Sequence, residues 1–146
     1  MAATTISNSP GTARGKAWRW VGPELTAYSA KVTTGIGLAF DISQWKHVGF
    51  TIAGSGTAAG TVKAKIAFAS GVDFNSAASP TNPWTYCSLN TYHDGAVVAG
   101  GTGIVLAADG VVSGELNQNS ARYVCFEQAA YSTGAFTVKL YPVNNV

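Results

Sequence analysis

Charge is scarce in this sequence. Of its 146 residues only 11% are Asp, Glu, Lys or Arg, against about a quarter in a typical soluble domain. With 47% hydrophobic residues, the chain can bury the core of one ordinary domain and is not held unfolded by charge repulsion. Its net charge of +2 is too weak for the basic stripe of a nucleic-acid-binding domain. We therefore expect one folded domain with no nucleic-acid partner.

Long apolar runs are also missing. No stretch of about 18 apolar residues occurs, so we expect no membrane partner. The first ten residues lack a charged start followed by an apolar run, which favours synthesis in a reducing cytoplasm. The two cysteines, Cys87 and Cys125, are then expected as buried thiols, with a disulfide as the less favoured alternative.

Groupings of residues that carry chemistry are few. The two histidines, His47 and His93, belong to no CxxC or HxxxH pair, so we expect no metal and no cofactor. No GxSxG elbow occurs, and the glycine clusters lack the Lys-Ser/Thr pair of a phosphate loop. Asp41, Asp94 and Asp109 lie in or beside expected turns, where aspartate has a structural role. We expect a protein that is not an enzyme.

What the sequence does contain is alternation of apolar and polar residues. In Thr61–Phe68 the residues expected to face inward are Val62, Ala64, Ile66 and Phe68, and those expected to face outward are Thr61, Lys63, Lys65 and Ala67. A period of two predicts a half-buried strand. Trp45–Ala53 and Gly134–Tyr141 repeat the pattern, and Ala121–Gln128 is apolar on both faces, as in a strand covered on two sides.

Turn residues separate these segments. Gly54-Ser55-Gly56, Asp94-Gly95, Gly100-Gly101 and Asp109-Gly110 each predict a tight turn. Weaker strand candidates are Ala17–Val21, Leu25–Thr33, Gly37–Asp41, Trp84–Asn90, Gly103–Ala107 and Val111–Leu116. Short strands at this spacing predict an all-β fold, a two-sheet antiparallel sandwich of jelly-roll-like form. Residues 16–146 form the expected sandwich domain, residues 1–15 an extended N-terminal arm, and Ser70–Pro83 a long surface loop.

Aromatic residues supply the candidate binding sites. Trp18 and Trp20 flank Arg19, and Trp and Arg are the residues most enriched at interface hot spots. Our candidate partner-binding residues are Arg14, Lys16, Trp18, Arg19 and Trp20. A second group, Trp84, Tyr86 and Tyr92, lies around the long loop and forms a candidate glycan-binding platform. For both groups the alternative is packing in the core.

The order of several segments resembles a known class of protein. They are Phe40–Ile52, Thr61–Phe68, Gly101–Leu106, Asn119–Val124 and Gly134–Tyr141. Together, within residues 37–141, they resemble the small β-sandwich virion proteins of tailed bacteriophages. The resemblance implies a capsid decoration (cement) protein that binds the major capsid protein lattice. It also implies assembly in the host cytoplasm, a place in the virion and a homo-oligomer, with a trimer favoured.

Other functions stay open at this point. A tail, neck or baseplate structural protein of a tailed phage is an alternative that the same resemblance implies. A carbohydrate-binding module would use Trp84, Tyr86 and Tyr92. A hydrolase would need a cleft with clustered acids, with Asp73, Asp94 and Glu127 as the residues to substitute.

Overall fold

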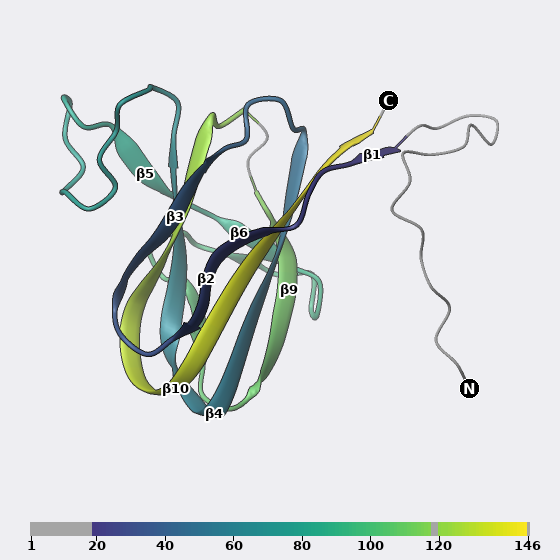
Figure 1. Ribbon diagram of the computed structural model, residues 1–146, viewed down its shortest axis with the longest axis vertical. Coiled ribbons are helices and arrows are strands. Elements are labelled where there is room, and N and C mark those ends of the chain that lie inside the picture. Colours follow the sequence, from purple (N-terminus) through teal and green to yellow (C-terminus); the bar gives the residue numbers. More distant parts are fainter. Residues whose placement is uncertain (1–18, 118–119, 146) are drawn as a thin grey trace.

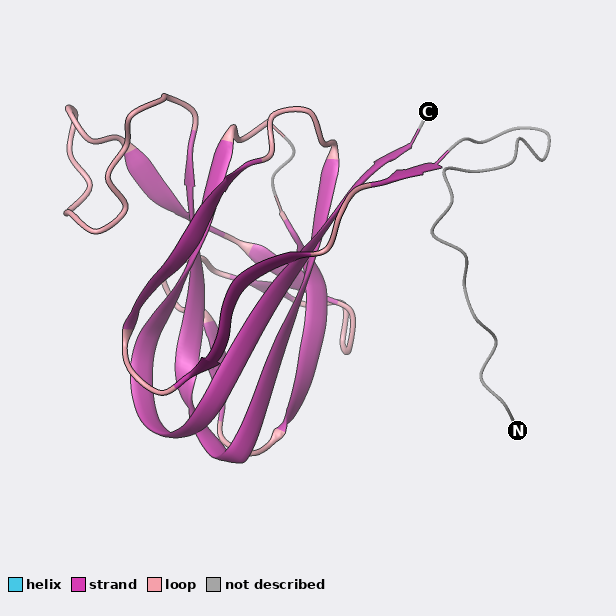
Figure 2. Ribbon diagram, viewed as in Figure 1, coloured by secondary structure: helices cyan, strands magenta, loops and turns pink. Residues whose placement is uncertain are grey.

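The computed structural model describes residues 19–117 and 120–145, and this part of the chain contains strands and loops but no helix (Figure 2). The strands are β1 (Arg19–Val21), β2 (Leu25–Lys31), β3 (Gly35–Asp41), β4 (His47–Ala67), β5 (Trp84–Cys87), β6 (Leu89–Thr91), β7 (Val97–Val98), β8 (Ile104–Leu106), β9 (Gly110–Leu116) and β10 (Tyr123–Asn145). All of their pairings are antiparallel. The predicted all-β, antiparallel class is confirmed.

The fold is organised by its two longest strands. β4 and β10 pair from Ala67 opposite Tyr123 to His47 opposite Val143. The other strands join them at their edges, in the order β1-β10-β4-β9-β6-β7, with β2 and β3 also on β10 and β5 and β8 also on β4. Hydrogen bonding thus joins ten strands into one sheet that does not close into a barrel.

Both long strands bend at the same place. On β4 the bend is the pair Gly56 and Thr57, whose φ angles are 70° and 63°. On β10 it is Gly134, whose φ is 87° and where an added Cβ would lie 2.6 Å from the Ala58 Cα atom. Only glycine fits such a close approach with a positive φ. The bend folds the sheet over, so that its two halves lie face to face (Figure 1).

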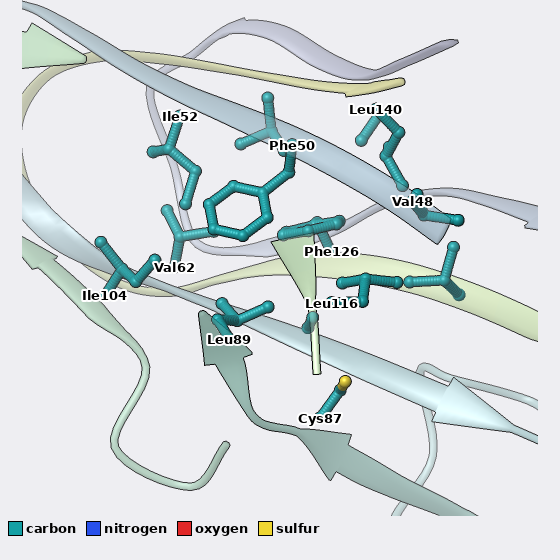
Figure 3. Close-up of a cluster of buried hydrophobic side chains, with 14 of the residues drawn as sticks. Val48, Phe50, Ile52, Val62, Cys87, Leu89, Ile104, Leu116, Phe126 and Leu140 are labelled. Atoms are coloured by element: carbon teal, nitrogen blue, oxygen red, sulfur yellow. The ribbon is translucent and has the colours of Figure 1, made fainter. Parts of the chain in front are cut away.

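The two halves enclose a common core. The first layer contains β1, β2, β6, β7, β9, the beginning of β4 and the end of β10; the second contains β3, β5, β8, the end of β4 and the beginning of β10. Phe50 of the first layer and Phe126 of the second are both buried, and their ring centroids lie 5.8 Å apart (Figure 3). Two separate sheets were predicted, but β4 and β10 run through both layers and make them one. The jelly-roll-like form stays a prediction.

The predicted strand faces are largely confirmed. Val48, Phe50 and Ile52 are buried on β4, and Phe136, Val138 and Leu140 are buried on β10. Phe68 was predicted to face the core, but it lies beyond the end of β4 and is 55% exposed. Lys65 was predicted to face solvent, but it is buried.

Lys65 is buried because the segment 68–83 covers the outer face of the second layer. A small second core forms there from Ala67, Phe74 and Cys125. The Lys65 Nζ atom donates to the Phe74 carbonyl oxygen at 2.9 Å and lies 3.5 Å from a Glu127 carboxylate oxygen. The predicted surface loop, Ser70–Pro83, therefore covers the sheet, which explains why the segment Ala121–Gln128 has apolar residues on both faces.

The two ends of the described chain leave the body together. β1 pairs with the end of β10, with Arg19 opposite Asn145 and Val21 opposite Val143. This two-stranded ribbon projects from the layers at the end opposite the bend (Figure 1). Residues 1–15, the expected arm, lie outside the described residues.

Candidate functional site

Only part of the predicted partner-binding group lies in the described chain. Arg14, Lys16 and Trp18 lie outside the described residues. The backbone of Arg19 and Trp20 belongs to β1, in the projecting ribbon, where Trp20 pairs with Asn144. The fold therefore places the beginning of β1 beyond the two layers.

The aromatic pair Trp84 and Tyr86 is held by the chain itself. The two rings lie edge to face with centroids 5.2 Å apart. Lys65 places its ammonium 4.2 Å from the Trp84 ring centroid, and Lys63 places its own 4.9 Å from that of Tyr86. The Tyr86 hydroxyl donates to Glu127 at 3.0 Å, and burial together with this carboxylate raises the pKa of that hydroxyl. Both rings are half-buried, so much of their aromatic surface already contacts other residues of the chain.

Tyr92 does not join that pair. It follows β6 in the first layer, and its backbone N–H donates to the Ser113 carbonyl oxygen at 3.0 Å. Its side chain is 65% exposed. The proposed platform of Trp84, Tyr86 and Tyr92 is therefore divided between β5 in the second layer and a separate groove on the first.

That groove, which we call the Gly49 groove, is a depression of about 370 Å³ on the outer face of the first layer. Its lining residues are His47, Gly49, Phe50, Thr51, Tyr92, Ser113, Gly114, Glu115, Tyr141 and Val143. Gly49 pairs with Glu115 on one side and with Tyr141 on the other, so these three residues form one row across the layer. Because glycine has no side chain, the middle of the row is hollow.

A second opening of about 490 Å³ lies at the edge of the layers, among β7, β8 and β9. It is bordered by apolar side chains that include Val98, Ile104 and Val112. Val97, Val105 and Val111 nearby are 61%, 63% and 65% exposed. His93 and Asp94 supply its polar rim.

The described residues contain no group of three or more His, Cys, Asp and Glu side chains that could hold a metal ion. Cys87 and Cys125 are buried free thiols, as predicted. Burial raises the pKa of each to about 11, so neither is an activated nucleophile at neutral pH. Within residues 19–117 and 120–145 there is no helix long and apolar enough to cross a membrane.

Comparison with known proteins gives one informative likeness. No family model matches this sequence, and no curated protein matches it in sequence. Among solved structures, the chain is similar to SPBc2 prophage-derived protein YomS, with a TM-score of 0.65 and 16% sequence identity. The similarity covers 92% of this chain and 100% of YomS. At this level of identity the two proteins share a fold.

Sequence reasoning missed the Gly49 groove as a site. The sequence did contain a sign of it. Val48 and Phe50 face the core, so Gly49 between them faces outward, and at this position the outer face of the strand has no side chain. A glycine inside a strand marks a place where the sheet surface lacks a side chain. The opposing Tyr141 and Glu115 become its neighbours only through the register of β4 with β10 and β9.

Proposed function

We propose that this chain is a non-enzymatic structural component of a tailed-phage virion, and that it decorates the capsid by binding the major capsid protein lattice. The observation that carries the proposal is the likeness to a prophage-derived protein over nearly the whole length of both chains. The order of strands that resembles small virion proteins in the sequence supports the same origin. Assembly in the host cytoplasm as a homo-oligomer, most simply a trimer, belongs to this proposal.

The surface of the molecule is suited to extensive contact with other subunits. Charged groups are few, at 11% of the chain, so few charges would have to be desolvated at a contact. Lys139 and Glu24 already neutralise each other at 2.7 Å. Several large apolar side chains, among them Leu38, Val105 and Val111, are exposed on strands.

The β1–β10 ribbon gives the proposed arm a starting point. A fifteen-residue arm can span at most about 50 Å when extended, which is long enough to reach a neighbouring subunit. Trp18, Arg19 and Trp20 at the root of the arm are the proposed anchors. Ordering the arm on docking costs conformational entropy, so strong anchors and many copies on one particle are needed.

Purified particles test the main proposal. Particles from the strain that carries the gene should contain this protein after density-gradient purification, detected by mass spectrometry with the major capsid protein as internal standard. Decoration predicts a copy number comparable to that of the capsid protein and immunogold label over the whole head. Absence of the protein from purified particles would refute a virion role.

The same particles separate the alternatives within the virion. A few copies per particle, with label at one vertex or along the tail, would identify a neck, tail or baseplate protein and refute decoration. Light scattering of the purified chain tests the trimer.

The arm has a test of its own. Deletion of residues 2–15 is expected to leave a folded domain that no longer binds particles lacking the native protein. The matched control is a chain in which the same residues are replaced by a Gly/Ser segment of equal length. Full binding by the truncated chain would refute the role of the arm.

The carbohydrate-binding alternative is less well supported at its original site. Trp84 donates its Nε1–H to the Ser76 carbonyl oxygen at 2.8 Å, and Lys65 lies over its ring. A pyranose would have to compete with these contacts. The geometry suited to a sugar lies instead in the Gly49 groove.

A further inference from the structure

The Gly49 groove combines a hollow floor with aromatic sides. An added Cβ at Gly49 would lie 3.5 Å from the Gly114 carbonyl oxygen and 3.6 Å from that of Tyr141, both ordinary contact distances. The floor is therefore empty, although a side chain would fit there. Tyr141 borders the floor on one side, where its hydroxyl lies 3.4 Å from Thr51 Oγ1, and Tyr92 lines the groove beyond Ser113.

Several polar side chains in the groove have no partner among the described residues. The Glu115 carboxylate, the Ser113 hydroxyl and the His47 ring form no hydrogen bond or ion pair with residues 19–117 or 120–145. Within the same groove, Thr51 and Tyr141 contact each other. The groove thus offers one acceptor-only carboxylate and several groups that both donate and accept.

This set of groups matches one ligand chemistry well. A pyranose presents C–H groups to an aromatic face and hydroxyls at its rim, so tyrosine rings and a carboxylate can be used at the same time. Phosphate and carboxylate ligands are disfavoured because the groove has a glutamate and no lysine or arginine in its lining. A volume of about 370 Å³ lies at the small end of the range for ligand sites, and the groove is open at the surface, which suits one or two units of a longer chain.

We propose that the Gly49 groove binds a neutral oligosaccharide, with Tyr92 and Tyr141 against sugar rings, Glu115 accepting hydrogen bonds from hydroxyls, and Gly49 making room for the ring between them. This site is distinct from the aromatic pair on β5. The inference does not depend on a role in a virion, since it rests on the groove alone.

The test is a glycan array of neutral and anionic oligosaccharides that includes cellohexaose, maltohexaose and chitohexaose, followed by isothermal titration of the full chain with the array's best binder. The expected result is binding of a neutral glycan, with affinity about tenfold weaker for Tyr92→Ala. Glu115→Gln, which keeps the shape but removes the charge, is expected to weaken binding by about tenfold as well. Gly49→Ala should fold normally and bind more weakly, because its methyl group fills the floor.

Matched controls keep the result specific. Phe68→Ala removes an exposed aromatic side chain outside the groove and should bind like the parent chain, and Trp84→Ala tests the alternative pair. Thermal unfolding of each variant separates lost binding from lost folding. The proposal is overturned if no neutral glycan binds at about 10 mM, if anionic glycans are preferred, or if binding is lost in Trp84→Ala but kept in folded Tyr92→Ala and Gly49→Ala.

Discussion

Gln128 is a fully buried polar side chain in the core, and replacing it provides the most stringent test of the fold. The Tyr28 hydroxyl donates to Gln128 Oε1 at 3.1 Å, and Gln128 Nε2 donates to the Ala130 carbonyl oxygen at 2.9 Å. The side chain lies next to the register shift between Gln128 and Ala130 on β10. Burial, chiefly, raises the pKa of the Tyr28 hydroxyl well above its usual value, so it stays protonated and needs an acceptor.

The substitution Gln128→Met keeps the length of the side chain but removes the amide. It leaves the Tyr28 hydroxyl and the Ala130 carbonyl oxygen without their partner. Each unsatisfied buried group costs about 1–3 kcal/mol, and the apolar side chain recovers about 1 kcal/mol by burial. We therefore expect a loss of about 1–5 kcal/mol in the free energy of unfolding, a large share of the roughly 5–15 kcal/mol of a typical domain.

Urea unfolding followed by circular dichroism measures this loss, and a double-mutant cycle identifies its cause. Tyr28→Phe alone should cost about 1 kcal/mol, since it removes one hydrogen bond. In the Gln128→Met background the same change should be neutral or stabilising, which gives a coupling energy of about 1–2 kcal/mol. Additive effects, or a loss of less than about 0.5 kcal/mol for Gln128→Met, would show that these buried hydrogen bonds do not act together to stabilise the fold.

Three other outcomes follow from the described contacts. Thr57→Gly should raise the free energy of unfolding by about 1 kcal/mol in the same urea assay, because a β-branched residue is strained at a φ of 63°. Lys65→Met should lower it by about 1–3 kcal/mol and speed proteolysis within residues 68–83, because the Phe74 carbonyl oxygen loses its donor; unchanged cleavage would contradict the covering role of that segment. Cys87 and Cys125 should react with iodoacetamide at pH 8 only after unfolding. Since their folded pKa of about 11 exceeds the ordinary 9.0, the stability that their burial gives is complete below pH 9 and lost as the pH rises through about 11.

The strands were largely predictable because a period of two is a local property. Val48, Phe50 and Ile52 alternate in sequence and are buried in the fold. The continuity of β4 was not predictable. Gly54-Ser55-Gly56 is also the pattern of an ordinary hairpin turn, and hydrogen bonding continues past it only because β10 bends at Gly134, far along the chain.

The environment of single residues was harder to predict, because it depends on segments that lie far away in the sequence. The alternating pattern of its strand places Lys65 on the side that faces solvent, yet the segment 68–83 folds back over it. Tyr92 was predicted to join Trp84 and Tyr86 in a glycan-binding platform, but its neighbours in the groove come from β4, β9 and β10. Contacts between strands far apart in sequence, not the aromatic residues alone, decide what such a surface can bind.

The pairing of β1 with the end of β10 also gives the molecule a polarity. Both ends of the described chain emerge at one pole, while the bend at Gly56 and Gly134 forms the other (Figure 1). A copy tethered close to Arg19 or to Asn145 would thus turn the same pole away from its support. A surface that holds the protein at Arg19 and a surface that holds it at Asn145 would therefore display the same face of the molecule, with the bend outermost.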